Sequence, residues 1–134
     1  MEVIRRNTDY SFRLMATLAK YHDHCVSVRQ LAKESCVPYQ LSCKLLQKLS
    51  SAGLVASKMG PKGGYKLACE PESINLKQIV EAIQGPVIFN QCLTDGFECP
   101  LSQGCPVSGH LAKMQAEMND HLAAKTLAML AGKD

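Results

Sequence analysis

The sequence has 134 residues, of which 46% are hydrophobic and 20% are charged. This composition is typical of one globular domain with room for an added helix, and it excludes an intrinsically disordered chain. No apolar run approaches the roughly 20 residues needed to cross a bilayer. The N-terminal stretch MEVIRRNTDYSFRLM lacks the apolar core of a secretory signal, so we expect a cytoplasmic protein without membrane contact.

The net charge of +3 is unevenly distributed. Residues 1–69 contain eleven Lys/Arg and four Asp/Glu, whereas residues 70–134 contain four Lys/Arg and eight Asp/Glu. A basic half indicates an anionic partner, and nucleic acid is the first candidate.

Residues 8–21 predict a first helix, with Thr8 as its N-cap and apolar or aromatic side chains at helical spacing. The segment HDHCVS reads as a polar connection rather than a metal site, because its possible ligands are adjacent instead of spaced for convergence. Ser27 then caps a short second helix, which ends near Ser35.

A third helix follows the CVP link and is predicted to end at Gly53. Four leucines share its inner face, while Gln40, Cys43, Lys44 and Gln47 point outward. A short helix, a three-residue turn and a longer helix with a polar outer face are typical of a helix-turn-helix.

Two β-prone runs, LVASKM and YKLAC, flank GPKGG and predict a hairpin. This hairpin carries Lys58, Lys62 and Lys66 and would form the wing of a winged helix-turn-helix. The predicted fold class is therefore mainly α, with a two-stranded β wing and a long C-terminal dimerisation helix.

The chain divides into four predicted parts. They are the DNA-binding domain at 1–70, a supporting helix within 71–89, a cysteine loop at 90–106 and a dimerisation helix at 107–134. The last helix, expected to run unbroken from Val107 to about Leu130, repeats Leu111, Met114, Met118, Leu122 and Met129 on one stripe. Too little chain remains to cover this stripe, so a second copy is the expected partner.

The winged helix-turn-helix and the basic half together favour binding to double-stranded operator DNA, against the alternative of a protein-interaction module. Gln40 and Lys44 are best placed to reach base edges in the major groove, because amide and ammonium groups suit purine acceptors. The full candidate DNA-binding set is Arg29, Tyr39, Gln40, Cys43, Lys44, Gln47, Lys48, Lys58 and Lys62, among which Tyr39, Lys48, Lys58 and Lys62 are candidate phosphate contacts.

Cys92, Cys99 and Cys105 are spaced C-x6-C-x5-C within a loop rich in Gly and Pro. Structural zinc sites usually use C-x2-C pairs, whereas an iron–sulfur cluster accepts wider spacing because its ligand positions lie several Å apart. The alternative is a surface loop whose cysteines bind no ligand, although such exposed thiols would be prone to oxidation. The residues left open for a fourth ligand are Asp9, His110, Glu98, Asp95, His22 and His24.

The remaining cysteines carry less information. Cys36 and Cys69 stand in apolar or turn contexts and are expected to be small core residues. Cys43 lies on the expected recognition face, where it touches a thymine methyl or is simply tolerated.

Several segments together resemble the Rrf2 family of bacterial regulators, of the IscR, NsrR and RirA type. They are TDYSFRLM, SVRQLAKESCVPYQLSCKLLQKLSSAGLV, GPKGGYKLA, INLKQIVEAIQGP and C…ECPLSQGCPV, and the resemblance covers about residues 5–130. It implies a homodimeric winged-helix repressor or activator with one iron–sulfur cluster per subunit, either 2Fe-2S or 4Fe-4S, which senses iron, nitric oxide or redox state.

By this resemblance Cys92, Cys99 and Cys105 are cluster ligands. The IscR type takes a histidine three residues after the last cysteine, where this chain has Ser108. The NsrR type takes a carboxylate on the first helix of the partner subunit, where this chain has Asp9. Asp9 of the partner subunit is therefore the favoured fourth ligand, and His110 is the second choice.

Two other kinds of protein compete with this interpretation. One is a winged-helix DNA-binding protein with a structural zinc site or no metal. The other is a redox enzyme that uses the thiols directly, and no C-x-x-C pair or acid–base partner supports it. We expect no catalytic residues and no small-molecule substrate.

Overall fold

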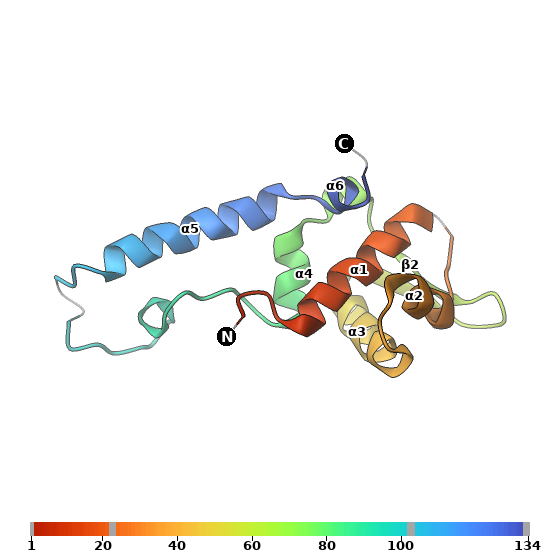
Figure 1. The fold of residues 1–134 in the computed structure, drawn as a ribbon, viewed down its shortest axis with the longest axis horizontal. Helices are drawn as coiled ribbons and strands as arrows, with labels where there is room; N and C mark the ends of the chain where they lie inside the picture. Colours follow the sequence, from red (N-terminus) through yellow and green to blue (C-terminus); the bar gives the residue numbers. More distant parts are fainter. Residues whose placement is uncertain (1, 22–23, 102–103, 133–134) are drawn as a thin grey trace.

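The structure, a computed structural model, describes residues 2–21, 24–101 and 104–132. Helices α1 to α4 and a small β-sheet form a body at one end of the molecule (Figure 1). Helix α5 and the segment that precedes it project from this body as an arm (Figure 1). The mainly α, winged fold class predicted from the sequence is confirmed.

Helix α1 (Arg6–Tyr21) lies at the centre of the body and packs against α2, α3, α4, α6 and β2. Leu14 and Leu18, one turn apart, are buried as their helical spacing predicts. The prediction that Thr8 caps this helix was wrong, because α1 begins two residues earlier. Thr8 is instead fully buried, and its hydroxyl donates to Oε1 of Gln84 at 2.6 Å.

Helices α2 (Val28–Ser35) and α3 (Tyr39–Ser51) form the predicted helix-turn-helix. The Ser27 hydroxyl accepts from the Gln30 backbone N–H, which confirms Ser27 as N-cap. Beyond α3, Gly53 adopts a positive φ of 81°, as expected for a glycine after a helix C-terminus.

Strands β1 (Val55–Lys58) and β2 (Gly64–Leu67) pair antiparallel and confirm the predicted wing. Val26, in the segment expected to be only a polar connection, is buried and exchanges two backbone hydrogen bonds with Tyr65 of β2. The wing is thus attached to the chain between α1 and α2. Gly64 allows this contact, since a Cβ there would lie 2.1 Å from the carbonyl oxygen of Val26.

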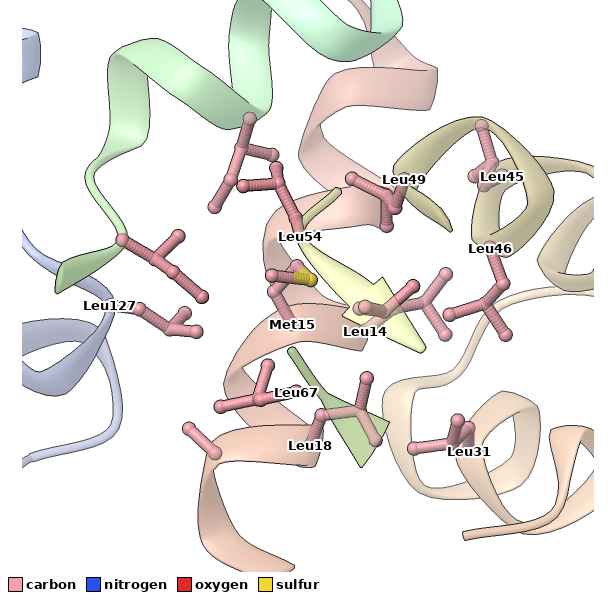
Figure 2. Packing of buried hydrophobic residues seen from close by; sticks show 14 of the residues in the cluster. Leu14, Met15, Leu18, Leu31, Leu45, Leu46, Leu49, Leu54, Leu67 and Leu127 are labelled. Carbon is pink, nitrogen blue, oxygen red and sulfur yellow. The ribbon is translucent and has the colours of Figure 1, made fainter. Parts of the chain in front are cut away.

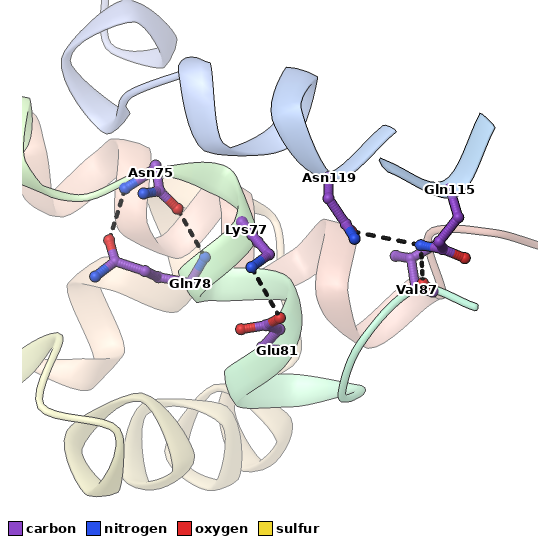
Figure 3. A network of polar contacts seen from close by, with 7 residues as sticks. All are labelled: Asn75, Lys77, Gln78, Glu81, Val87, Gln115 and Asn119. Atoms are coloured by element: carbon purple, nitrogen blue, oxygen red, sulfur yellow. Dashed lines mark hydrogen bonds and ion pairs between the residues drawn. The ribbon is translucent and has the colours of Figure 1, made fainter. Parts of the chain in front are cut away.

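Within 71–89, the 3-10 helix η1 (Pro71–Ser73) precedes the supporting helix α4 (Leu76–Ile83). Asn75 and Gln78 form a reciprocal capping box, in which each side chain accepts from the other residue's backbone N–H (Figure 3). Ile79 and Val80 are buried, and α4 packs against α1, α3 and α5. Helix α4 therefore links the body to the arm.

The cysteine loop contains a short 3-10 helix, η2 (Gln91–Leu93), and leads into α5 (Ser108–Ala124). The prediction of one helix to about Leu130 was wrong. Lys125 is extended, and Thr126 caps a separate short helix, α6 (Leu127–Leu130). The break has a physical cause, since the Leu127 N–H donates to the Ile74 carbonyl and the Lys125 carbonyl accepts from the Leu76 N–H.

One hydrophobic core joins the body, and Figure 2 shows its leucines converging from α1, α2, α3 and the wing. Leu127 of α6 also points into this core and is fully buried. Helix α5, in contrast, contains no buried residue. The C-terminal segment thus returns to the body after the arm has left it.

Candidate nucleic-acid interface and cysteine loop

Helix α3 separates a core face from an exposed polar face. Ser42, Leu45, Leu46 and Leu49 are buried, whereas Gln40, Lys44, Gln47 and Lys48 are exposed. These four exposed side chains belong to the predicted DNA-binding set, and they lie on one helix as that prediction requires. Leucine burial fixes the rotation of α3 and so decides which side chains face outward.

Arg29 and Tyr39 meet across the turn between α2 and α3. The Arg29 guanidinium carbon lies 4.8 Å from the centroid of the Tyr39 ring, a cation–π distance. Together with Lys33 they line a shallow hollow of about 280 Å³. Stacking holds the arginine donors beside the start of α3, where a DNA phosphate would approach in helix-turn-helix docking.

Cys43 occupies a different position from the other outward residues of α3. It is only partly exposed. Burial raises the pKa of Tyr65 on β2, and the charge of a nearby Cys43 thiolate raises it further. Cys43 is therefore less accessible than the other outward side chains of α3 and lies close enough to the wing to influence Tyr65.

The wing presents Lys58, Lys62 and Lys66 to solvent. Within the described ranges, neither these lysines nor Lys44 and Lys48 of α3 form an ion pair with a carboxylate. Their charge is therefore available to an external anion, as counterion release at DNA requires.

Cys92, Cys99 and Cys105 are all partly exposed, and each thiol is free of a disulfide. Cys92 lies within η2, and the Cys99 sulfur accepts from the Leu101 N–H at 3.4 Å. Cys105 lies just before α5, where the Val107 and Ser108 N–H groups and the Ser108 hydroxyl lower its pKa. The loop thus holds soft thiol ligands within reach of solvent.

The three thiols do not converge in the part of the chain that the structure describes. No set of three or more His, Cys, Asp or Glu side chains there is arranged to hold a metal ion. The chemistry of the donor set nevertheless fits an iron–sulfur cluster, which is bound by thiolates on a backbone able to wrap it.

Cys36 and Cys69 were predicted to be core residues, and this was wrong because both are exposed.

The two favoured fourth ligands lie on different elements. Asp9 is in the first turn of α1, and its Oδ2 accepts from the Arg13 guanidinium at 2.9 Å. His110 is exposed in the first turn of α5. Of the other candidates, His24, Asp95 and Glu98 are exposed, and His22 lies outside the described residues.

Sequence reasoning missed the polar contacts that hold the linker between α4 and the loop. Gln84 accepts from the Arg5 N–H and from Thr8, and it donates to the Val3 carbonyl. Gln115 of α5 donates to the Val87 carbonyl (Figure 3) and accepts from the Phe89 N–H. No periodicity marks such glutamines, because their partners are backbone groups far away in the sequence.

A further feature of this region is an open groove of about 930 Å³ where the linker passes beside the N-terminal segment and α5. Its apolar lining comes from Val3, Pro86, Val87, Ile88, Phe89 and Leu111. Val3 and Ile88 remain about half exposed, at 53% and 46%. The apolar lining thus extends from the N-terminal segment across the linker to Leu111 of α5.

A helix-turn-helix with an exposed polar recognition helix and a basic wing defines a winged-helix DNA-binding protein. The Rrf2 family, described as "Iron-dependent Transcriptional regulator", matches residues 4–133. The chain belongs to this family of DNA-binding transcriptional regulators. No helix among the described residues is long and apolar enough to span a membrane.

Named relatives include the regulator NsrR of Shouchella clausii, which is 33% identical over 106 residues, covering 78% of this chain and 71% of that protein. IscR of Cereibacter sphaeroides is 37% identical over 73 residues, covering 54% of this chain and 47% of IscR. These relatives are transcriptional regulators, not enzymes.

Two solved structures superpose on almost the whole of this chain. CymR, "the Global Cysteine Regulator of B. subtilis", superposes with a TM-score of 0.79 at 28% identity and 98% coverage of each chain. IscR of T. potens superposes with a TM-score of 0.74 at 26% identity, covering 95% of this chain and 85% of that chain.

Proposed function

We propose that this regulator is a cytoplasmic homodimer that senses iron, nitric oxide or redox state through one iron–sulfur cluster per subunit. Cys92, Cys99 and Cys105 would hold the cluster, with Asp9 of the partner subunit as the fourth ligand and His110 as the second choice. When bound, such a cluster supplies a redox-active centre that small oxidants can attack. The protein's own residues bind it and transmit its presence to the DNA-binding elements.

The observation that carries this proposal is the position of the thiols. They occupy a partly exposed loop between α4, which packs on the DNA-binding body, and α5, which leaves it. A structural role would favour buried thiols, whereas sensing requires access from solvent. Binding of a cluster to this loop would therefore affect the body through α4 and the arm through α5.

In this proposal, dimerisation makes operator binding sensitive to small structural changes at the cluster. Two recognition helices must reach half-sites about one DNA turn apart, roughly 34 Å, so small changes in subunit orientation alter operator binding. A ligand bond from Asp9 of one subunit to the loop of the other would tie α1 to the opposite arm. In the isolated chain Asp9 is paired with Arg13 instead, so this bond requires the Arg13 pair to open.

The test compares operator binding by the anaerobically purified, iron-replete protein with that of Cys99→Ala at fixed salt. We expect the variant to lose visible absorption and to change in operator affinity, while its circular dichroism stays that of the folded chain. Cys69→Ala, which changes an exposed thiol outside the loop, is the matched control. Equal affinities and equal site preference for Cys99→Ala and the native protein would contradict the switch.

A second candidate is a winged-helix DNA-binding regulator with a structural zinc site or no metal. The failure of the described thiols to converge favours only the metal-free form of this candidate, because a zinc site would also need converging ligands. Iron, sulfide and zinc analysis of the anaerobic protein separates the two candidates. A colourless sample that binds its operator fully would support this second candidate.

A further inference from the structure

One side chain on the arm is bonded to the segment that enters the cysteine loop. The Gln115 Oε1 accepts from the Phe89 N–H at 2.8 Å. Its Nε2 donates to the Val87 carbonyl (Figure 3). A single amide thus pairs with an N–H and a carbonyl two residues apart, in the manner of a neighbouring β-strand. Residues 85–90 have no helix or strand of their own, so these two bonds satisfy backbone groups that would otherwise lack secondary-structure partners.

The chemistry of this contact selects glutamine. Only a primary amide offers one acceptor and one donor side by side; a glutamate would face the Val87 carbonyl with a second oxygen. Asn119, one turn further along α5, accepts from the same Nε2 at 3.4 Å and helps to orient it. Val87 is buried and Gln115 half-buried, which keeps competing water away from the bonds.

Position makes the contact relevant to the loop. Phe89 is three residues before Cys92, and Asn90 between them caps η2, the short helix that contains Cys92 and packs against α5. Cys105 lies three residues before α5 begins, and Gln115 lies seven residues inside it, about 10 Å along its axis. Both ends of the cysteine loop are therefore attached to one rigid helix.

We propose that Gln115 is a positioning residue that clamps segment 87–89 to α5 and thereby fixes Cys92 relative to Cys105. The clamp reduces the conformations available to the loop before any ligand binds, and so lowers the entropy lost when the thiols converge. Its link to sensing rests on the cluster proposed above, but the clamp itself is a property of the metal-free chain.

The test uses the full-length protein with Gln115→Met, which keeps the size and apolar stem but removes both bonds, and with Gln115→Glu, which removes the donor. Glu117→Met, an exposed position on the same helix, is the matched control. Backbone amide exchange of residues 89–93 in the metal-free protein is measured first. We expect exchange to rise about tenfold in Gln115→Met, which loses both bonds, and to stay at the native rate in the control. The rise should be smaller in Gln115→Glu, because its carboxylate can still accept from the Phe89 N–H.

The rate at which a chelator removes iron from the anaerobically reconstituted proteins is measured second. We expect loss to be about tenfold faster in Gln115→Met, with the circular dichroism and the operator affinity of the metal-free protein unchanged. Native exchange rates at 89–93 in Gln115→Met would overturn the clamp. Faster exchange with an unchanged rate of iron loss would overturn the positioning of Cys92. If the native protein takes up no iron and sulfide, the sensing function fails instead, and the exchange rates still decide the clamp.

Discussion

At the residue scale, backbone conformation and hydrogen bonding determine where Cys36 and Thr8 lie and what their side chains contact. Cys36 was expected in the core from its apolar neighbours, yet it is exposed because it ends α2 in the left-handed region, at φ 56° and ψ 45°. A sequence pattern records hydrophobicity but not dihedral angle. Thr8 was similarly predicted to be a cap, although its hydroxyl is used to bond Gln84 across the molecule.

The left-handed conformation of Cys36 leads to a stability prediction. Glycine has no Cβ to clash in this region, so Cys36→Gly should raise the free energy of unfolding by about 1 kcal/mol. Urea denaturation monitored by circular dichroism measures the change. Cys69→Gly removes another exposed thiol without positive φ and should not stabilise; a gain in both variants would point to thiol chemistry instead.

Two residues of the DNA-binding set should affect DNA binding in different ways. Lys62→Ala in the wing should weaken binding to specific and nonspecific DNA alike, and lower the slope of log K against log salt by about 0.9, if it contacts one phosphate. Gln40→Ala should leave that slope unchanged and cost about 1–3 kcal/mol of discrimination at one base pair. Fluorescence anisotropy over a salt series measures both quantities. An unchanged slope for Lys62→Ala would place the wing away from the phosphates.

At the element scale, the body was largely predictable and the arm only in part. Leucine spacing gave the inner face of α3, and the glycines of GPKGG gave the wing turn, because both depend on local periodicity and turn chemistry. The end of α5 was not predictable. Lys125 and Thr126 leave the helix to pair with the segment before α4, and such nonlocal pairing leaves no local signal.

The attachment of the wing depends on Gly64. Its φ of 143°, together with the 2.1 Å that would separate an added Cβ from the Val26 carbonyl oxygen, predicts that Gly64→Ala costs about 3 kcal/mol of stability. Gly60→Ala, where φ is also positive but the added Cβ has no neighbour within 4 Å, should cost less, about 1–2 kcal/mol. Thermal denaturation of the two variants measures the difference. Equal losses would show that backbone strain, not contact with Val26, constrains this position.

At the scale of the whole molecule, the cysteines were located by sequence but their arrangement was not. Spacing identified a thiol-rich loop, yet convergence on one centre depends on chain closure and, in our proposal, on a second subunit. The predicted apolar stripe lies on α5 as far as Leu122, whereas Met129 falls in α6. On α5, Met114 is 51% exposed, and Leu111, Met118 and Leu122 remain partly exposed within the described chain. Uncovered apolar surface of this extent is typical of an interaction surface.

The proposed dimer can be tested on α5. Met118→Glu places a charge in the stripe and should raise the dimer dissociation constant about a hundredfold or more, because an unpaired charge is costly to bury. Ala116→Glu, on the opposite and exposed face of the helix, is the control and should leave the constant unchanged. Sedimentation equilibrium measures both. Equal dissociation constants for Met118→Glu and the native chain would place the subunit contact elsewhere.

The return of α6 to the core has a mechanical consequence. The polypeptide leaves the body after α4 and returns to it at α6, where Leu127 is buried in the core and the backbone pairs with Ile74 and Leu76. The segment between α4 and α6 is therefore anchored to the body at both ends. A protease that severs the exposed stretch around Pro100 would leave two fragments that still share one core. After cleavage, the two fragments should still elute together from a size-exclusion column. The DNA-binding body should stay folded, although the covalent connection through the cysteine loop has been cut.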